Sequence, residues 1–124
     1  RLRKAIRGRV TVERQEESIP VPMLVEYDDI NSGTVHSTVT PGGQGMITGK
    51  LIKFDPADPQ QGIFFVANDN TATRVEVMAW NGVRKHIFAV PDLASGEYRL
   101  EVRTRYTEAG DLRAGALPDK LVVP

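Results

Sequence analysis

The chain has 124 residues, no cysteine and a formal net charge of zero at pH 7, which is the size of one domain with a substantial core. Hydrophobic residues make up 40% and charged residues 26%, a composition typical of soluble globular proteins. The lack of cysteine excludes a disulfide framework and thiolate chemistry. No apolar run approaches the length of a membrane-spanning helix.

The charges are unevenly divided along the chain. Residues 1–14 hold six of the sixteen basic and one of the sixteen acidic residues, which leaves ten basic and fifteen acidic residues in the remainder. Such a split is typical of a nucleic-acid contact or of a solvated linker, and both alternatives remain open. A nucleic-acid contact would act through counterion release, without sequence specificity. The cations that we assign to it are Arg1, Arg3, Lys4, Arg7 and Arg9.

The chain begins with arginine, so we expect it to be part of a longer protein. We interpret residues 1–15 as a basic connector from an upstream domain and residues 16–124 as the folded domain. Within that domain, short apolar segments alternate with turns rich in proline and glycine, which is typical of a β-sandwich. No segment predicts a helix.

The first half of the domain predicts three strands. Met23 to Tyr27 is expected at a sheet edge because prolines precede it, and the polar segment Thr34 to Thr40 is expected at another edge. Pro41-Gly42-Gly43 predicts a turn. In the next strand, Met46 to Phe54, Gly49 indicates a bulge or a close backbone approach.

Three further strands are predicted in the middle of the chain. Gly62 to Ala67 is apolar on both faces and is therefore placed at the centre of a sheet. Arg74 to Trp80 and Val83 to Val90 flank Asn81-Gly82, which is a strong hairpin signal. A two-residue turn there would not bring apolar residues opposite each other, so a wider loop or two strands in different sheets remain open.

The clearest strand follows Gly96. Its alternation predicts one buried face, made of Tyr98, Leu100, Val102, Thr104 and Tyr106. The charges on the other face, Glu97, Arg99, Glu101, Arg103 and Arg105, predict a solvated surface with cross-strand ion pairs.

Tyr98 resembles the tyrosine corner of immunoglobulin-type sandwiches, because it begins a late strand two residues after a glycine. After that strand, Gly110 and Gly115 predict a turn, and Leu117 to Val123 predicts a closing strand. The complete pattern predicts an all-β fold, an Ig-like β-sandwich of about seven antiparallel strands.

Residues with chemical potential are few. The two histidines, His36 and His86, are predicted at the surface, and no serine is placed near either of them. We therefore expect no enzymatic activity, no metal and no cofactor. Trp80 is predicted in the core. Three aspartates, Asp55, Asp58 and Asp69, would suit calcium if they gathered at one end, but turn stabilisation is the favoured interpretation.

Several segments together resemble a known bacterial family. They are Tyr27–Thr34, Thr40–Gly43 followed by Ile47–Lys53, Gly62–Phe65 and Val90–Tyr98. The family is a domain of unknown function with an Ig-like fold, which typically lies C-terminal to an HU/IHF-like DNA-binding domain. The resemblance extends from about Pro20 to Val123, and residues 1–14 are similar to the connector that leaves the HU-like domain.

This resemblance implies a parent protein that binds DNA through the HU-like domain, in the cytoplasm and associated with the nucleoid. It implies no DNA contact by the Ig-like half, which would set spacing, recruit a protein partner through a sheet edge or mediate self-association. An alternative remains open: a secreted or cell-surface Ig-like module that binds carbohydrate or protein. Ig-like sandwiches support both functions.

Overall fold

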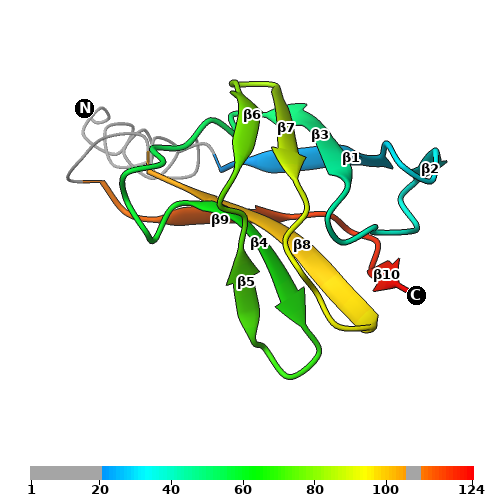
Figure 1. Ribbon diagram of the computed structural model, residues 1–124. Coiled ribbons are helices and arrows are strands. Elements are labelled where there is room, and N and C mark those ends of the chain that lie inside the picture. Colours follow the sequence, from blue (N-terminus) through cyan, green and yellow to red (C-terminus); the bar gives the residue numbers. More distant parts are fainter. Residues whose placement is uncertain (1–20, 106–109) are drawn as a thin grey trace, which may run out of the picture.

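Two five-stranded antiparallel sheets make up the domain (Figure 1). The computed structural model describes residues 21–105 and 110–124. The first sheet has the order β2-β1-β3-β7-β6, and it consists of β1 (Met23–Asp29), β2 (Thr34–Val35), β3 (Gln44–Lys50), β6 (Met78–Asn81) and β7 (Lys85–Ala89). The second has the order β10-β8-β4-β5 with β9 also paired to β8, and it consists of β4 (Gly62–Ala67), β5 (Ala72–Arg74), β8 (Gly96–Thr104), β9 (Arg113–Ala116) and β10 (Leu121–Val123).

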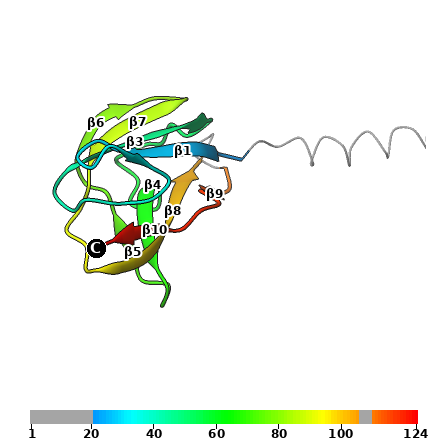
Figure 2. The same ribbon diagram turned by 90° about the vertical axis from the view of Figure 1, so that its right-hand side faces the viewer.

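Four aromatic rings hold the two layers together. Tyr27 and Phe88 come from the first sheet, and Phe65 and Tyr98 come from the second. Neighbouring ring centroids lie 6.1 to 6.5 Å apart, a spacing at which each aromatic pair adds about 0.5–1.5 kcal/mol beyond its buried area. Figure 2 shows the two sheets as separate layers. The predicted all-β, Ig-like sandwich is confirmed.

The alternation predicted for β8 is confirmed over the described residues. Tyr98, Leu100, Val102 and Thr104 are buried, whereas Tyr106 lies outside the described residues. The central position of β4 is also confirmed, since β4 lies between β8 and β5. Five of its six residues are buried, as its uniformly apolar sequence requires.

The described residues form ten strands, more than the seven or so predicted. One reason is that Arg74 to Trp80, expected as one strand, divides between the two sheets. Val75 N still donates to Ile63 O in the second sheet over 2.8 Å, whereas Val77 O accepts from Ala89 N in the first over 3.0 Å. The chain crosses between the sheets at Glu76 without a glycine or proline to mark the change.

The predicted hairpin at Asn81-Gly82 has the wider loop. Asn81 pairs with His86 and Trp80 pairs with Ile87, and a β-bulge separates Trp80 from Met78. Residues 82–84 therefore form the turn, which the hydrogen bond from Gly82 N to Lys85 O closes. This register places Met78 opposite Phe88, which gives the apolar contact that a two-residue turn would not.

Two glycines allow backbones to approach closely. A Cβ at Gly49 would lie 2.1 Å from Met23 O, which confirms the predicted close approach, and the register of β1 shifts opposite this position. The second close approach is at Gly115, where a Cβ would lie 1.9 Å from Pro22 O. The prediction of a turn that ends at Gly115 is wrong, because Gly115 lies within β9.

The predicted edge strand Thr34 to Thr40 is shorter than expected, whereas the predicted edge strand Met23 to Tyr27 extends to Asp29. β2 contains two residues, which pair with Asp28 and Asp29, so the rest of β1 has a neighbouring strand on one side. Beyond β2, the chain crosses to the second sheet, where Val39 N donates to Val122 O over 2.9 Å. No helix within the described ranges has the length and apolarity required to cross a bilayer.

Candidate interaction surfaces

Tyr98 has the hydrogen bond that defines a tyrosine corner. Its hydroxyl donates to Ala94 O over 2.7 Å, and its ring packs in the core. Gly96, two residues earlier, has a φ of 148°, a conformation that glycine adopts without steric cost. The tyrosine therefore ties the loop before β8 to the core, which is a structural role.

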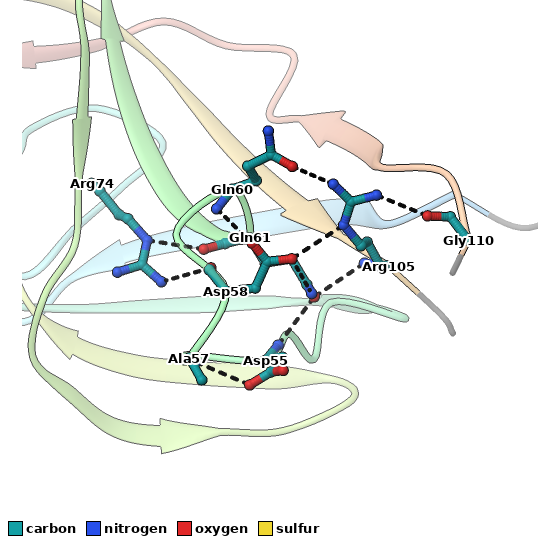
Figure 3. A network of polar contacts seen from close by, with 8 residues as sticks. All are labelled: Asp55, Ala57, Asp58, Gln60, Gln61, Arg74, Arg105 and Gly110. Atoms are coloured by element: carbon teal, nitrogen blue, oxygen red, sulfur yellow. Dashed lines mark hydrogen bonds and ion pairs between the residues drawn. The ribbon is translucent and has the colours of Figure 1, made fainter. Parts of the chain in front are cut away.

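Arg74 holds the loop between β3 and β4 from one side (Figure 3). Its Nε donates to Gln61 O over 2.9 Å, and its Nη2 donates to Pro56 O over 3.2 Å and to Asp58 O over 3.3 Å. Arg74 itself lies at the end of β5, so these bonds connect an irregular loop to the second sheet.

Arg105 holds the same loop from the other side. Its Nε donates to Asp58 Oδ2 over 3.1 Å, its Nη1 donates to Gly110 O over 2.8 Å, and its Nη2 donates to Gln60 Oε1. The pKa of the Asp58 carboxyl is lowered, chiefly by the Gln60 backbone N–H and then by the Gln61 side chain, with a smaller effect of Arg105. The network uses each of these Arg105 nitrogens internally, so it acts as a clamp.

An open cleft of about 450 Å³ lies beside this clamp. Its lining residues are Lys53, Phe54, Asp55, Pro56 and Arg105. The predicted gathering of Asp55, Asp58 and Asp69 does not occur: the first two lie in the loop that precedes β4, and Asp69 follows the opposite end of that strand. The turn interpretation fits, because Asp55 and Asp69 each accept a hydrogen bond from a backbone N–H two residues later.

The charged face of β8 is more ordered than a solvated surface. Glu101 accepts from Arg99 over 3.3 Å and from Arg103 over 2.6 Å. Both pairs lie within one strand, so the expectation of cross-strand pairs is wrong for them. Arg103 also covers the ring of Phe64, with its guanidinium carbon 4.1 Å from the ring centroid. Arg103 thereby shields an aromatic ring on the outer face of the second sheet.

The prediction that both histidines lie at the surface is wrong for His86, which is fully buried. Its Nε2 lies 2.6 Å from Ile52 O. A carbonyl only accepts, so Nε2 carries the proton. Burial lowers the pKa of His86. His36 is partly exposed, and its Nδ1 lies 3.2 Å from a carboxylate oxygen of Asp119.

Four cationic residues lie on two segments that backbone hydrogen bonds join, the end of β3 with the chain after it and the β6–β7 turn with the start of β7. They are Lys50, Lys53, Arg84 and Lys85, which we call the basic corner. All four are exposed. Among residues 21–105 and 110–124, none of the four forms an ion pair. An open cleft of about 270 Å³, lined by Lys50, Leu51, Val83 and Arg84, lies between the two segments.

Backbone hydrogen bonds fix the basic corner in place. Gly49 N donates to Arg84 O over 2.9 Å, and Ile52 N donates to Val83 O over 3.0 Å. The Asn81 side chain then bonds both the N–H and the carbonyl of Phe54. Two segments far apart in sequence are thereby joined side by side.

Trp80 lies beside the basic corner, with 58% of its surface exposed. The prediction of a buried Trp80 is wrong, because its partner in the sheet is the outward-facing Ile87. Ile87 pairs in turn with Met46, so the three residues form an apolar row across the outer face of the first sheet. A Cβ at Gly82 would lie 2.7 Å from Trp80 Nε1, which places the indole against the β6–β7 turn.

The N-terminal cations assigned to nucleic-acid contact lie outside the described residues. They are Arg1, Arg3, Lys4, Arg7 and Arg9. Sequence reasoning did not find the basic corner, because its members come from two segments that only the tertiary structure joins.

Comparisons with known proteins identify the fold. A family model, described as a domain of unknown function (DUF4469) with Ig-like fold, matches residues 23–114. Among solved structures, a "Putative bacterial DNA binding protein" from Bacteroides vulgatus is similar, with a TM-score of 0.70 and 21% sequence identity. The match covers 82% of this chain and 47% of that protein, so this chain spans less than half of its length. At this identity the likeness shows the fold alone. The search among curated proteins finds no match.

Proposed function

Because the chain belongs to the DUF4469 family of Ig-like domains of unknown function, we propose that it is a non-enzymatic accessory domain of an HU-like DNA-binding protein. On this proposal, the parent protein binds DNA through a domain upstream of Arg1 and works in the cytoplasm, on the nucleoid. The Ig-like domain adds a spacer and a contact surface.

The observation that carries this proposal is the charge of residues 1–14, about +5, directly before the Ig-like domain. A polyanion attracts such a segment through counterion release. Residues 1–14 occupy the position at which members of the resembled family have the connector from an HU-like domain. The similar protein from Bacteroides vulgatus is described as a putative DNA-binding protein, which supports the proposal.

The first sheet supports a contact role for the Ig-like half. Its edge strand β6 has a neighbour on one side, and an exposed edge is a common site for protein partners or for self-association. The apolar row of Trp80, Ile87 and Met46 begins at this edge. A non-enzymatic role is supported by the clamp, because it uses Arg74 and Arg105 to hold a loop.

A second candidate function is a cell-surface or secreted module that binds carbohydrate or protein. The exposure of Trp80 favours it, because an exposed aromatic ring provides a platform for sugars and for protein side chains. The two proposals differ in what the gene encodes before Arg1.

The coding sequence upstream of Arg1 is therefore the first test. About one hundred residues with HU-like features support the accessory role, whereas a signal peptide or further Ig-like repeats would contradict it. The second test titrates duplex DNA with the full-length protein and with the same protein lacking the Ig-like domain. We expect both to bind DNA. Failure of the full-length protein to bind would refute the proposal.

A further inference from the structure

We infer that the basic corner is a contact surface for the phosphate backbone of DNA, so that the Ig-like domain touches the DNA itself. The inference rests on the proposed function for the identity of the polyanion. It goes beyond that function, which assigns DNA binding to the upstream half. The reasons are the charge of the corner, its fixed geometry and its position at the end of the first sheet where β1 begins.

Within the described residues, no ion pair neutralises a cation of the basic corner. Two acidic residues lie near it in the sheet or in the sequence, Glu26 and Asp55. Glu26 lies in one row with Lys85, but Thr48 on β3 separates them, and two strand spacings are about 10 Å. Asp55 lines the cleft beside the clamp together with Lys53, whereas Lys50 and Arg84 line the other cleft without an acidic residue. Like charges on neighbouring segments repel one another, and a polyanion relieves that repulsion.

The geometry of the basic corner is fixed before any ligand arrives. Its two segments are held by the hydrogen bonds from Gly49 and Ile52 to the turn and by the Asn81 side chain. The cations therefore project from backbone that needs no ordering on binding, which lowers the entropic cost of association.

The basic corner lies at the end of the first sheet where β1 begins. Met23, the first residue of β1, pairs with Lys50 at the end of β3. The chain therefore enters the first sheet at the strand end that carries Lys50. The turn between β4 and β5 lies at the opposite end of the molecule from the turn between β6 and β7 (Figure 1).

The fluorescence of Trp80 can detect DNA that binds at the basic corner. It is the single tryptophan of the chain, it is exposed, and it lies against the turn that carries Arg84 and Lys85. DNA bound at the corner changes the surroundings of the indole.

The test titrates the 124-residue chain with a short duplex and follows both the Trp80 emission and the anisotropy of labelled DNA. We expect quenching or a shift of the emission at saturation. The variant Lys50→Gln/Arg84→Gln should lose that change and lower the slope of log K against log salt by about 1.8, since each phosphate contact contributes about 0.9. No DNA binding at low salt, or an unchanged emission at saturation, would overturn the inference.

A matched control removes two cations from the opposite end of the molecule. Arg99→Gln/Lys120→Gln alters residues near the β4–β5 turn, where Lys120 bonds Asn68, and Glu101 keeps its bond to Arg103. We expect the wild-type salt slope and emission change. If this variant lowers the salt slope and the emission change as much as the corner variant does, binding depends on the overall charge of the domain. That result would refute a specific contact surface at the corner.

A third variant separates this inference from the proposed function. It replaces the N-terminal cations Arg1, Arg3, Lys4, Arg7 and Arg9 with glutamine. If this N-terminal variant binds DNA more weakly but still shows the change in Trp80 emission at saturation, a separate contact at the corner is supported. If the N-terminal variant does not bind DNA and the corner variant binds like the wild type, the inference fails and the proposed function stands.

Discussion

Two buried tyrosines differ in a single hydrogen bond, and this difference gives a test at the residue scale. Tyr98 donates to Ala94 O, whereas the Tyr27 hydroxyl is buried with no partner among the described residues. We expect Tyr98→Phe to lower the free energy of unfolding by about 1–2 kcal/mol, because Ala94 O then loses its donor. Chemical denaturation monitored by circular dichroism measures the change.

Tyr27→Phe is the matched control for this prediction. Removal of a buried hydroxyl without a partner should be neutral within about 0.5 kcal/mol or stabilising. Equal destabilisation by both substitutions would mean that the Tyr98 hydrogen bond has no special role in the fold.

The buried histidine predicts a loss of stability in mild acid. Burial lowers the pKa of His86 below its ordinary value of 6.5, so the folded domain holds the neutral ring. As the pH falls below about 6.5, the unfolded chain binds a proton that the folded chain does not, and stability falls by at most about 1.4 kcal/mol per pH unit. The fall ends near the lowered pKa of the folded state.

Replacement of this ring by an apolar one should remove the effect. In His86→Phe, the free energy of unfolding should fall less between about pH 6.5 and pH 5 than in the wild type. His36→Gln is the control and should retain the fall. If His86→Phe and the wild type lose the same stability over this interval, burial of a neutral His86 is not its source.

At the scale of single residues, the burial of His86 is predictable from the sequence. His86, Phe88 and Val90 alternate in phase, and all three are buried, so the period alone indicates an inward His86. Trp80 was expected in the core because a sandwich of this size usually buries its tryptophan. The register of the hairpin places Trp80 outside instead, and the sequence left the length of the hairpin loop open.

At the scale of elements, the close approach at Gly115 gives the sharpest prediction. Gly115→Ala would place a Cβ against Pro22 O, and backbone cannot yield as a flexible side chain does. We expect a loss of about 1–3 kcal/mol in the free energy of unfolding, because β9 or the start of β1 must shift. Thermal and chemical denaturation measure this loss.

The control for Gly115→Ala lies on the same strand. Ala116 is exposed, and Ala116→Ser should change stability by less than about 0.5 kcal/mol. Wild-type stability in Gly115→Ala would contradict the close packing of β9 against the segment that precedes β1.

Strands with a regular hydrophobic pattern were predictable from the sequence. The point at which the chain passes from one sheet to the other was not. β8 and β4 follow from their hydrophobic pattern alone. The division of Arg74 to Trp80 into β5 and β6 does not, because every residue between them accepts an extended conformation. Their separation is decided by the pairing partners, Phe64 in one sheet and Phe88 in the other.

At the scale of the whole molecule, the sequence predicted the sandwich and the charged face of β8, and the tertiary structure revealed the basic corner. Residues 1–14 stand out because six cations lie close together in the chain. Lys50 and Arg84 do not, because they lie far apart in the chain. Pairing of β3 with β7 joins them, and the candidate contact surface arises from that pairing.

The most direct test of this account maps the DNA contact on the whole domain. Backbone amide shifts of the 124-residue chain are recorded by NMR while a short duplex is added. We predict that, within the described residues, the largest changes fall at residues 49–53 and 80–85, and that they vanish at high salt. Changes confined to the β4–β5 turn, or no changes among these residues at saturating DNA, would contradict the claim that the Ig-like domain touches DNA.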